Sequence, residues 1–211
     1  MKIHRSTFLL IGICLLCLSC CACSGFDVLT DTILAALGSL NVVLATIQTA
    51  FPNALVAAIE AADTVAQGAV NSLKSLYNNY IADKTGTGLL ADLQAGIAAV
   101  QQTLAQLEAS ANIVSAPVIA LISKIVSLVS DVLHEVATAI VPAVPAAIVA
   151  HAAGNSAPAL SLNDQMKSLA IKLRSDVQAA HTASGLDLAT TKAANDYIDH
   201  RLAHHIGKIR V

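Results

Sequence analysis

Three polar residues near the C-terminus have the types and the spacing of a metal site. Asp196, His200 and His204 are four residues apart, so a helix would place them on one face, and His205 stands beside them. Carboxylate and imidazole groups bind zinc, but ligands from one helix cannot close a tetrahedral site without a group from elsewhere. A zinc protease helix needs a glutamate after its first histidine, and Arg201 occupies that place. Two interpretations stay open: weak metal binding, or solvated histidines that complement a helix C-terminus.

A second polar group, formed by Asp131, His134 and Glu135, interrupts an otherwise apolar stretch. If buried, such a trio would have shifted pKa values and a functional role, whereas at the edge of a bundle it would be a solvated face. Di-iron centres in helical bundles require Glu-x-x-His pairs. The three glutamates of the chain, Glu60, Glu108 and Glu135, have no histidine three residues later, which disfavours this chemistry.

Signatures of nucleophilic catalysis and of phosphate binding are missing from the sequence. No serine stands in a Gly-x-Ser-x-Gly elbow, and residues 84–88 (Lys-Thr-Gly-Thr-Gly) have the lysine before the glycines, the reverse of a phosphate-binding loop. Thr87 is instead expected to cap a helix. We therefore expect no enzyme activity and no cofactor. A site assembled from scattered Asp, His, Ser and Lys side chains is the outside alternative.

The first 25 residues contain all five cysteines of the chain. Lys2 and Arg5 supply positive charge, and residues 8–18 form an apolar run. This length suits the hydrophobic region of an export signal, whereas a permanent membrane-spanning helix takes about 20 residues. We therefore interpret residues 1–19 as a signal peptide that is cleaved.

The residues after this run resemble the lipobox of bacterial lipoproteins, in which a small residue precedes the cysteine that becomes the lipidated N-terminus. Cys20 follows Leu18 and Ser19, with another cysteine where leucine is usual, and Cys23 follows Ala22 farther from the apolar run. The resemblance implies acylation of Cys20, with Cys23 as second choice, and a lipid-anchored tether over residues 20–25. A plain secretory signal and an uncleaved anchor remain alternatives.

The same resemblance implies a location and partners. Two acyl chains at one cysteine hold a protein stably on a membrane, so the lipid bilayer is the first expected partner and an envelope protein the second. Neither Cys21 nor Ser24, which follow the two candidate cysteines, is the aspartate associated with inner-membrane retention. We expect an exported, membrane-anchored lipoprotein, with the outer membrane preferred over the inner membrane.

Composition indicates an all-α fold. Hydrophobic residues make up 55% of the chain and aromatic residues only 3%, with abundant alanine, the strongest helix former. Because no cysteine follows Cys23, the remaining chain must be stable through packing rather than through disulfides. Loss of residues 1–19 removes two of the 12 basic residues and none of the 14 acidic ones, so the remaining chain has a net negative charge. A negatively charged chain is not a general nucleic-acid binder.

Apolar residues recur at spacings of three and four, which predicts six helices. The third stripe follows heptads and predicts coiled-coil-like packing, whereas the fourth helix has extra apolar residues off its stripe and should be central. The predicted stripes are Phe26, Leu29, Ile33, Leu37, Leu40, Leu44, Ile47 and Phe51; Ile59, Ala62, Ala66, Ala69, Leu73, Leu76 and Tyr80; Leu90, Leu93, Ile97, Val100, Leu104, Leu107, Ala111 and Val114; Val118, Ile122, Ile125, Val129, Val132 and Val136; Leu162, Met166, Leu169, Leu173 and Val177; and Ala194, Ile198, Leu202, Ile206 and Ile209.

Three prolines interrupt this pattern and predict a linker over residues 142–160. Ser161 or Asn163 is expected to cap the helix that follows, and Gly185 to end it. Short connections between long helices favour antiparallel neighbours. The predicted architecture is an antiparallel up-and-down bundle of about four long helices over residues 26–141, with a C-terminal helical hairpin over residues 161–211 that packs on the bundle.

Two functions fit this architecture. The first is a membrane-tethered, non-catalytic structural or interaction module of the cell envelope. The second is a membrane-active or lipid-binding bundle that inserts apolar helices, notably residues 115–141 and the proline-interrupted stretch 136–150. A mean hydropathy of +0.67 keeps this second function open. A continuous exposed apolar patch would favour insertion, whereas buried apolar stripes would favour the first function.

Overall fold

The computed structural model describes residues 24–48, 53–82, 88–111, 115–140 and 161–209. Within these ranges the chain forms six α-helices and no strand, which confirms the all-α prediction. The signal peptide (residues 1–19), Cys20, Cys23 and the linker over residues 142–160 lie outside the described residues. The helices are α2 (Ser24–Ile47), α3 (Asn53–Ala82), α4 (Leu89–Ser110), α5 (Ala116–Ile140), α7 (Leu162–Ala183) and α8 (Leu188–Ile209).

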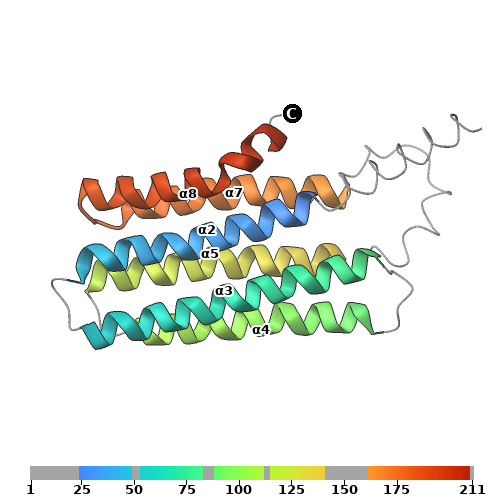
Figure 1. Ribbon diagram of the computed structural model, residues 1–211, viewed down its shortest axis with the longest axis horizontal. Coiled ribbons are helices and arrows are strands. Elements are labelled where there is room, and N and C mark those ends of the chain that lie inside the picture. The colour runs from blue at the N-terminus through green and yellow to red at the C-terminus, as the bar shows by residue number, and fades with distance from the viewer. Residues whose placement is uncertain (1–23, 49–52, 83–87, 112–114, 141–160, 210–211) are drawn as a thin grey trace, which may run out of the picture.

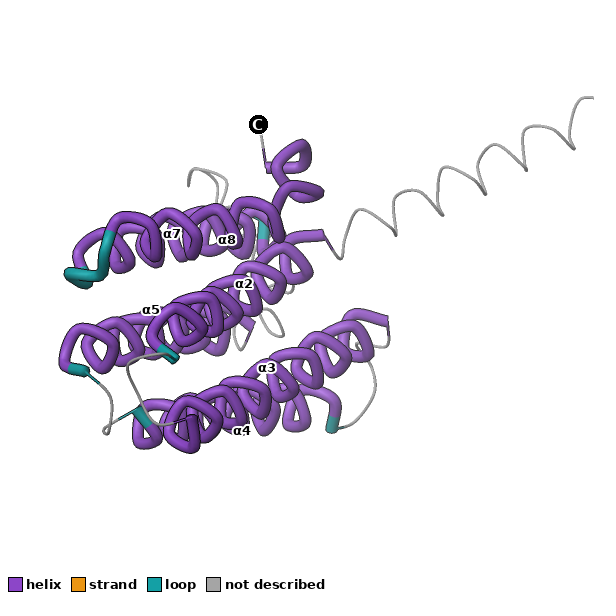
Figure 2. Tube along the Cα trace, turned by 60° about the vertical axis from the view of Figure 1, so that its left-hand side comes forward, coloured by secondary structure: helices purple, strands orange, loops and turns teal. Residues whose placement is uncertain are grey.

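These helices form three layers of two. Figures 1 and 2 show α7 and α8 in one outer layer, α2 and α5 in the middle, and α3 and α4 in the other outer layer. α2 contacts α3, α7 and α8 extensively and α5 sparingly, while α5 contacts α4 and α7. The hydrophobic core therefore lies on both sides of the middle layer.

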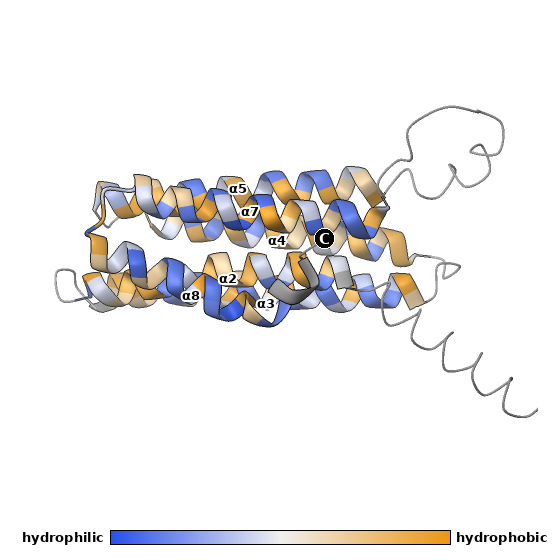
Figure 3. Ribbon diagram, turned by 90° about the horizontal axis from the view of Figure 1, so that it is seen from above, coloured by the Kyte–Doolittle hydropathy of each residue, from blue (hydrophilic) through white to orange (hydrophobic). Residues whose placement is uncertain are grey.

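The predicted apolar stripes supply this core. All stripe residues whose side chains the structure describes are buried or half-buried, while Phe51, Val114, Ile206 and Ile209 fall outside that description. Figure 3 shows the resulting alternation of apolar and polar faces along the helices. Full burial of each large aliphatic side chain stabilises the fold by about 1.5–3 kcal/mol. Packing is thus the main source of stability in this part of the chain.

α2 is more enclosed than α5. The predicted central helix, α5, lies in the middle layer (Figure 1) and contacts α4 and α7, but one of its sides is open to solvent. Of the most apolar window of α2, 78% is buried, against 44% for α5. One side of α5 exposes Lys124, Asp131 and Glu135 to solvent. α2 is enclosed because small residues on its second face, such as Ala35 and Ser39, let α7 and α8 approach closely.

Local signals set the helix ends as predicted, with one exception. The Ser161 hydroxyl caps α7 by accepting a hydrogen bond from the Asp164 backbone N–H at 3.2 Å, as predicted. After α7, Gly185 has a φ of +77°, a conformation that costs glycine little, as predicted for the end of that helix. The N-cap of α4 is Gly88, one residue after Thr87, which lies outside the described residues.

Candidate functional site

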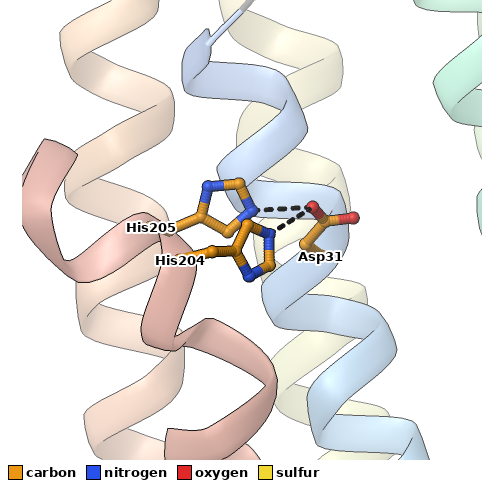
Figure 4. Close-up of side chains that lie close together, drawn as sticks. All are labelled: Asp31, His204 and His205. Atoms are coloured by element: carbon orange, nitrogen blue, oxygen red, sulfur yellow. Dashed lines mark hydrogen bonds and ion pairs between the residues drawn. The ribbon is translucent and has the colours of Figure 1, made fainter.

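Two histidines near the end of α8 converge on one carboxylate of α2 (Figure 4). The Nε2 atom of His205 donates a hydrogen bond to Asp31 Oδ2 at 2.7 Å, and the Nε2 atom of His204 lies 3.8 Å from the same oxygen. The ring centroids of the two histidines are 3.8 Å apart. His205 is buried, whereas His204 is 63% exposed at its side chain.

The other oxygen of Asp31 is held by α3. Lys74 Nζ donates to Asp31 Oδ1 at 3.0 Å and lies 3.4 Å from Asp27 Oδ1. Burial opposes ionisation of Asp31, but hydrogen bonds from His205 and Lys74 outweigh it and lower the pKa of Asp31. We call these five residues, Asp27, Asp31, Lys74, His204 and His205, the Asp31 cluster. It joins three helices around an ionised carboxylate.

Of the predicted metal ligands, only His204 belongs to this cluster. Asp196 forms an ion pair with Lys192, four residues earlier on α8. His200 is exposed and lines a surface cavity of about 280 Å³ with Asp31, Arg201 and His204. Asp31 offers a donor atom from a second helix, which a one-helix set would lack. The donor atoms that the structure brings together therefore belong to Asp31, His204 and His205, on α2 and α8.

A second polar group, which spacing did not indicate, lies inside the bundle. Ser39 Oγ of α2 is 3.1 Å from His181 Nε2 of α7, and His181 Nδ1 is 2.8 Å from Asn195 Oδ1 of α8. Ser39 and His181 are both 0% exposed. We call these three residues the Ser39 network. Serine, histidine and an orienting side chain in this order are the parts of a nucleophilic catalytic triad.

The hydrogen bonds of the Ser39 network are those of a structural connection. Ser39 Oγ donates to the Ala36 carbonyl at 2.6 Å, so its single proton is committed to its own helix. Burial lowers the pKa of His181, which leaves a neutral ring with one N–H. The single N–H of His181 donates either to Ser39 Oγ through Nε2 or to Asn195 Oδ1 through Nδ1, and in both cases the ring lies between polar groups of α2 and α8.

His181→Leu is expected to lower the free energy of unfolding by about 1–3 kcal/mol, because Asn195 and Ser39 lose a buried partner. The loss should shrink when Ser39→Ala is added, since one of the two orphaned groups is then removed. Urea unfolding of the full chain measures both values. His134→Leu, at an exposed position of α5, is the matched control and should change stability by about 0.5 kcal/mol or less. Equal stability of His181→Leu and the parent would contradict this role.

A third polar group centres on a buried acid at the interface of α3 and α2. Asp63 is 0% exposed, and its Oδ2 atom accepts hydrogen bonds from Asn41 Nδ2 at 2.8 Å and Gln67 Nε2 at 2.6 Å. Its Oδ1 atom and the Asn41 Oδ1 atom have no hydrogen-bond partner among the described residues. Burial raises the pKa of Asp63 to about 6, against the opposing effect of the two amide donors.

The predicted polar trio of α5 lies on the solvated face. Asp131, His134 and Glu135 are all exposed, and Glu135 Oε1 is 3.8 Å from Lys172 Nζ of α7. This confirms the solvated-face interpretation rather than a buried site. Elsewhere between α5 and α7, a groove of about 490 Å³ is lined mainly by Ala120, Leu121, Leu128, Ala179 and Ala183.

Three polar groups therefore stand out in an apolar bundle: the Asp31 cluster at its surface, and the Ser39 network and Asp63 in its interior. The Asp31 cluster combines metal-ligand atoms with solvent access, whereas the other two are enclosed. Comparison with known proteins adds no family to this description, since the chain matches no protein-family model, no curated protein and no solved structure.

Proposed function

We propose that the protein is a membrane-tethered helical-bundle lipoprotein that acts as a non-catalytic structural or interaction module of the cell envelope. Acylation of Cys20, or of Cys23 as second choice, would tether it to the bilayer, preferably the outer membrane. Its folded part would then act through its surface on an envelope protein. The lipobox-like residues of the N-terminus support the tether, and the packing of the helices supports the mode of action.

The finer architecture in this proposal is an antiparallel up-and-down bundle of α2, α3, α4 and α5 with α7 and α8 as a C-terminal hairpin. Contacts between helices that follow one another in the chain support it: α2 with α3, α3 with α4, α4 with α5, and α7 with α8. Short connections make such neighbours antiparallel. The hairpin would pack on the bundle mainly through α2.

The observation that carries the proposal is the burial of the apolar helix faces. Two helices, Gly25–Ile47 and Ala116–Ile140, are long and apolar enough to cross a membrane. In the part of the chain that the structure describes, however, the exposed large apolar residues are Val65, Ile171 and Leu188, one on each of three helices. An inserting bundle needs a continuous apolar patch. Scattered single residues support action through a polar surface.

The alternative, a membrane-active bundle that inserts α5, has a large energetic barrier in water. α5 buries ten residues, all large and aliphatic. At about 1.5 kcal/mol each, their exposure would cost roughly 15 kcal/mol, as much as the whole stability of a typical domain. Insertion would require the membrane to replace this burial as the helix leaves the bundle. This alternative therefore predicts membrane damage, which the tethered module does not.

Labelling with palmitate tests the tether. The full chain, expressed in a bacterium that processes lipoproteins, should incorporate labelled palmitate and fractionate with membranes. Cys20→Ser should abolish incorporation, because the acylated thiol is lost, while Cys23→Ser should leave it intact. If Cys23→Ser loses the palmitate label and Cys20→Ser keeps it, the acylated residue is Cys23. An unlabelled parent chain, or label in the double variant, would contradict the lipoprotein proposal.

Dye release tests the mode of action separately. The acylated full-length protein is added to vesicles of neutral lipid and of mixed neutral and anionic lipid, with detergent as the measure of full release. The tethered module should associate with both kinds of vesicle and release no dye. Release from either would favour the membrane-active alternative, even if palmitate labelling succeeds.

A further inference from the structure

We propose that Asp31, His204 and His205 form a binding site for a divalent transition-metal ion such as Zn²⁺, which would bridge α2 and α8. The proposal is independent of the lipid tether and of any surface partner. Each of the three residues offers one ligand atom, and these atoms lie within 4.8 Å of one another. Figure 4 shows both imidazole rings turned toward the Asp31 carboxylate.

This convergence is more than a result of sequence spacing. Neighbouring residues on a helix project in different directions, so His204 and His205 need not face the same group. Here their Nε2 atoms lie 3.8 Å and 2.7 Å from one oxygen, Asp31 Oδ2. Two nitrogens and one oxygen from two helices form a compact donor set that a single helix cannot offer.

The distances match a metal site after a small adjustment. Zinc–ligand bonds of about 2.0–2.2 Å at tetrahedral angles place the ligand atoms about 3.4 Å apart. The two observed distances, 2.7 Å and 3.8 Å, lie on either side of this value. His204 is 63% exposed, so its ring can move by a fraction of an ångström at little cost. On metal binding, the proton of a neutral His205 would reside on Nδ1, which leaves Nε2 free to coordinate the ion.

The surroundings prepare Asp31 as a ligand. Lys74 donates to the oxygen that does not face the histidines, so it fixes the orientation of the carboxylate. Two carboxylates, Asp27 and Asp31, contact Lys74 and offset its charge and that of Arg201, which lines the cavity beside Asp31. This balance lowers the repulsion that the two basic residues alone would exert on a metal ion.

The donor set also indicates the kind of metal and the strength of binding. Imidazole nitrogen suits zinc, copper and nickel, whereas calcium and magnesium require a shell of oxygens. The cavity beside Asp31 and His204 leaves room for water as a further ligand. His205 Nδ1 is buried without a hydrogen-bond partner among the described residues, and lack of such support lowers metal affinity by about 10–100-fold. We therefore expect micromolar rather than tighter affinity.

Calorimetric titration with ZnCl₂ tests the site. The full chain is used in mild detergent with all five N-terminal cysteines replaced by serine, because thiolates would bind zinc themselves. This parent should bind one zinc ion per chain. His204→Gln should weaken binding by about tenfold or more, since it removes one ligand at an exposed position that the fold does not need.

Two control variants locate the site. His134→Gln, an exposed histidine on α5, should bind zinc as the parent does. His200→Gln should also retain binding, because the proposed ligands do not include His200. A loss in His200→Gln equal to that in His204→Gln would overturn the proposal in favour of a one-helix site.

Thermal unfolding gives a second readout. Zinc that binds only the folded chain raises Tm, and this rise should be present in the parent and in His134→Gln but reduced in His204→Gln. MgCl₂ at the same concentration should cause no rise. Absence of zinc binding by the cysteine-free parent, or equal binding by His204→Gln, would overturn the proposal.

Discussion

Replacing Asp63 with asparagine is expected to stabilise the protein by about 3 kcal/mol at neutral pH. The pKa of Asp63 is raised by burial from its ordinary value of 3.8 to about 6, a difference of roughly two units at about 1.4 kcal/mol each. At pH 7 the folded chain therefore holds a carboxylate that would be better solvated after unfolding. Asparagine has nearly the same shape and carries no charge.

The sign of the pH dependence follows from proton binding. Between pH 3.8 and about 6, folded Asp63 holds a proton that the unfolded chain releases. The stability that this group contributes is therefore fully present below pH 3.8 and is lost as the pH rises through 6. Other acids act in the opposite direction, since the pKa of Asp31 is lowered. The contribution of Asp63 is therefore measured as the difference in free energy of unfolding between the parent and Asp63→Asn.

Urea unfolding of the parent and Asp63→Asn at several pH values measures this difference. The two should have similar stability near pH 4, and the variant should be the more stable at pH 7.5. Asp131→Asn, an exposed position on α5, is the matched control and should change stability by about 0.5 kcal/mol or less at either pH. A stability difference that does not change with pH, or an Asp63→Asn chain less stable than the parent at pH 7.5, would contradict the assignment.

The asparagine variant also addresses two unpartnered atoms. Asp63 Oδ1 and Asn41 Oδ1 are both acceptors, buried without a partner among the described residues. An ionised carboxylate has no proton to donate, whereas a protonated carboxyl or an amide at residue 63 has one. A buried polar atom without a partner costs about 1–3 kcal/mol. Any hydrogen bond that the new donor makes acts in the same direction as removal of the charge.

The helices were predictable from the sequence because their signal is local. Spacings of three and four place residues such as Leu93, Ile97 and Leu104 on one face whatever the rest of the chain does, and all three are buried. Caps are equally local, as Ser161 and Gly185 show. What a stripe does not specify is which other helices cover it, or whether the opposite face is covered too.

The enclosure of α2 on two faces was not predicted for this reason. The face of α2 opposite its leucine stripe contains small residues, which contribute little to a hydropathy pattern and therefore do not indicate a buried face. Gly38 shows their role: a Cβ atom there would lie 2.5 Å from the hydroxyl oxygen of Tyr197 on α8. The absence of a side chain thus lets α8 approach, a relation that becomes visible only when the two helices are paired in space.

The polar sites were missed because their members are far apart in the chain. Asp31 and His205 are separated by 174 positions, and Ser39 and His181 by 142. Local spacing instead joined Asp196 and His200 to His204, residues that share a helix. Periodicity can place a side chain on a face, but it cannot identify the neighbour across an interface.

Ending the chain at residue 160 is expected to abolish its cooperative unfolding transition. This deletion removes α7 and α8, whose buried Met166, Leu173, Val177, Ile198 and Leu202 together contribute roughly 8 kcal/mol or more at about 1.5–3 kcal/mol each. Such a loss equals the stability of many domains. It would also uncover the face of α2 that contacts α7 and α8, including the fully buried Ser39.

A pair of point variants tests the same interface without deletion. Leu173→Ala, at a position 1% exposed, should lower the free energy of unfolding by about 2–5 kcal/mol because it leaves a cavity between packed helices. Ile171→Ala, two residues earlier on α7 and 48% exposed, should cost far less. Circular dichroism during urea unfolding measures the full chain, both variants and the shortened chain.

The outcomes separate two ways in which the chain can be organised. If the shortened chain keeps a sharp transition, residues 26–141 are stable alone and α7 and α8 are an addition to a finished bundle. The alternative outcome is that the shortened chain loses the transition and that Leu173→Ala lowers the free energy of unfolding far more than Ile171→Ala does. In that case α7 and α8 are part of one core built around α2. We expect the second result, because α2 makes its most extensive contacts with α7 and α8 rather than with α3 or α5.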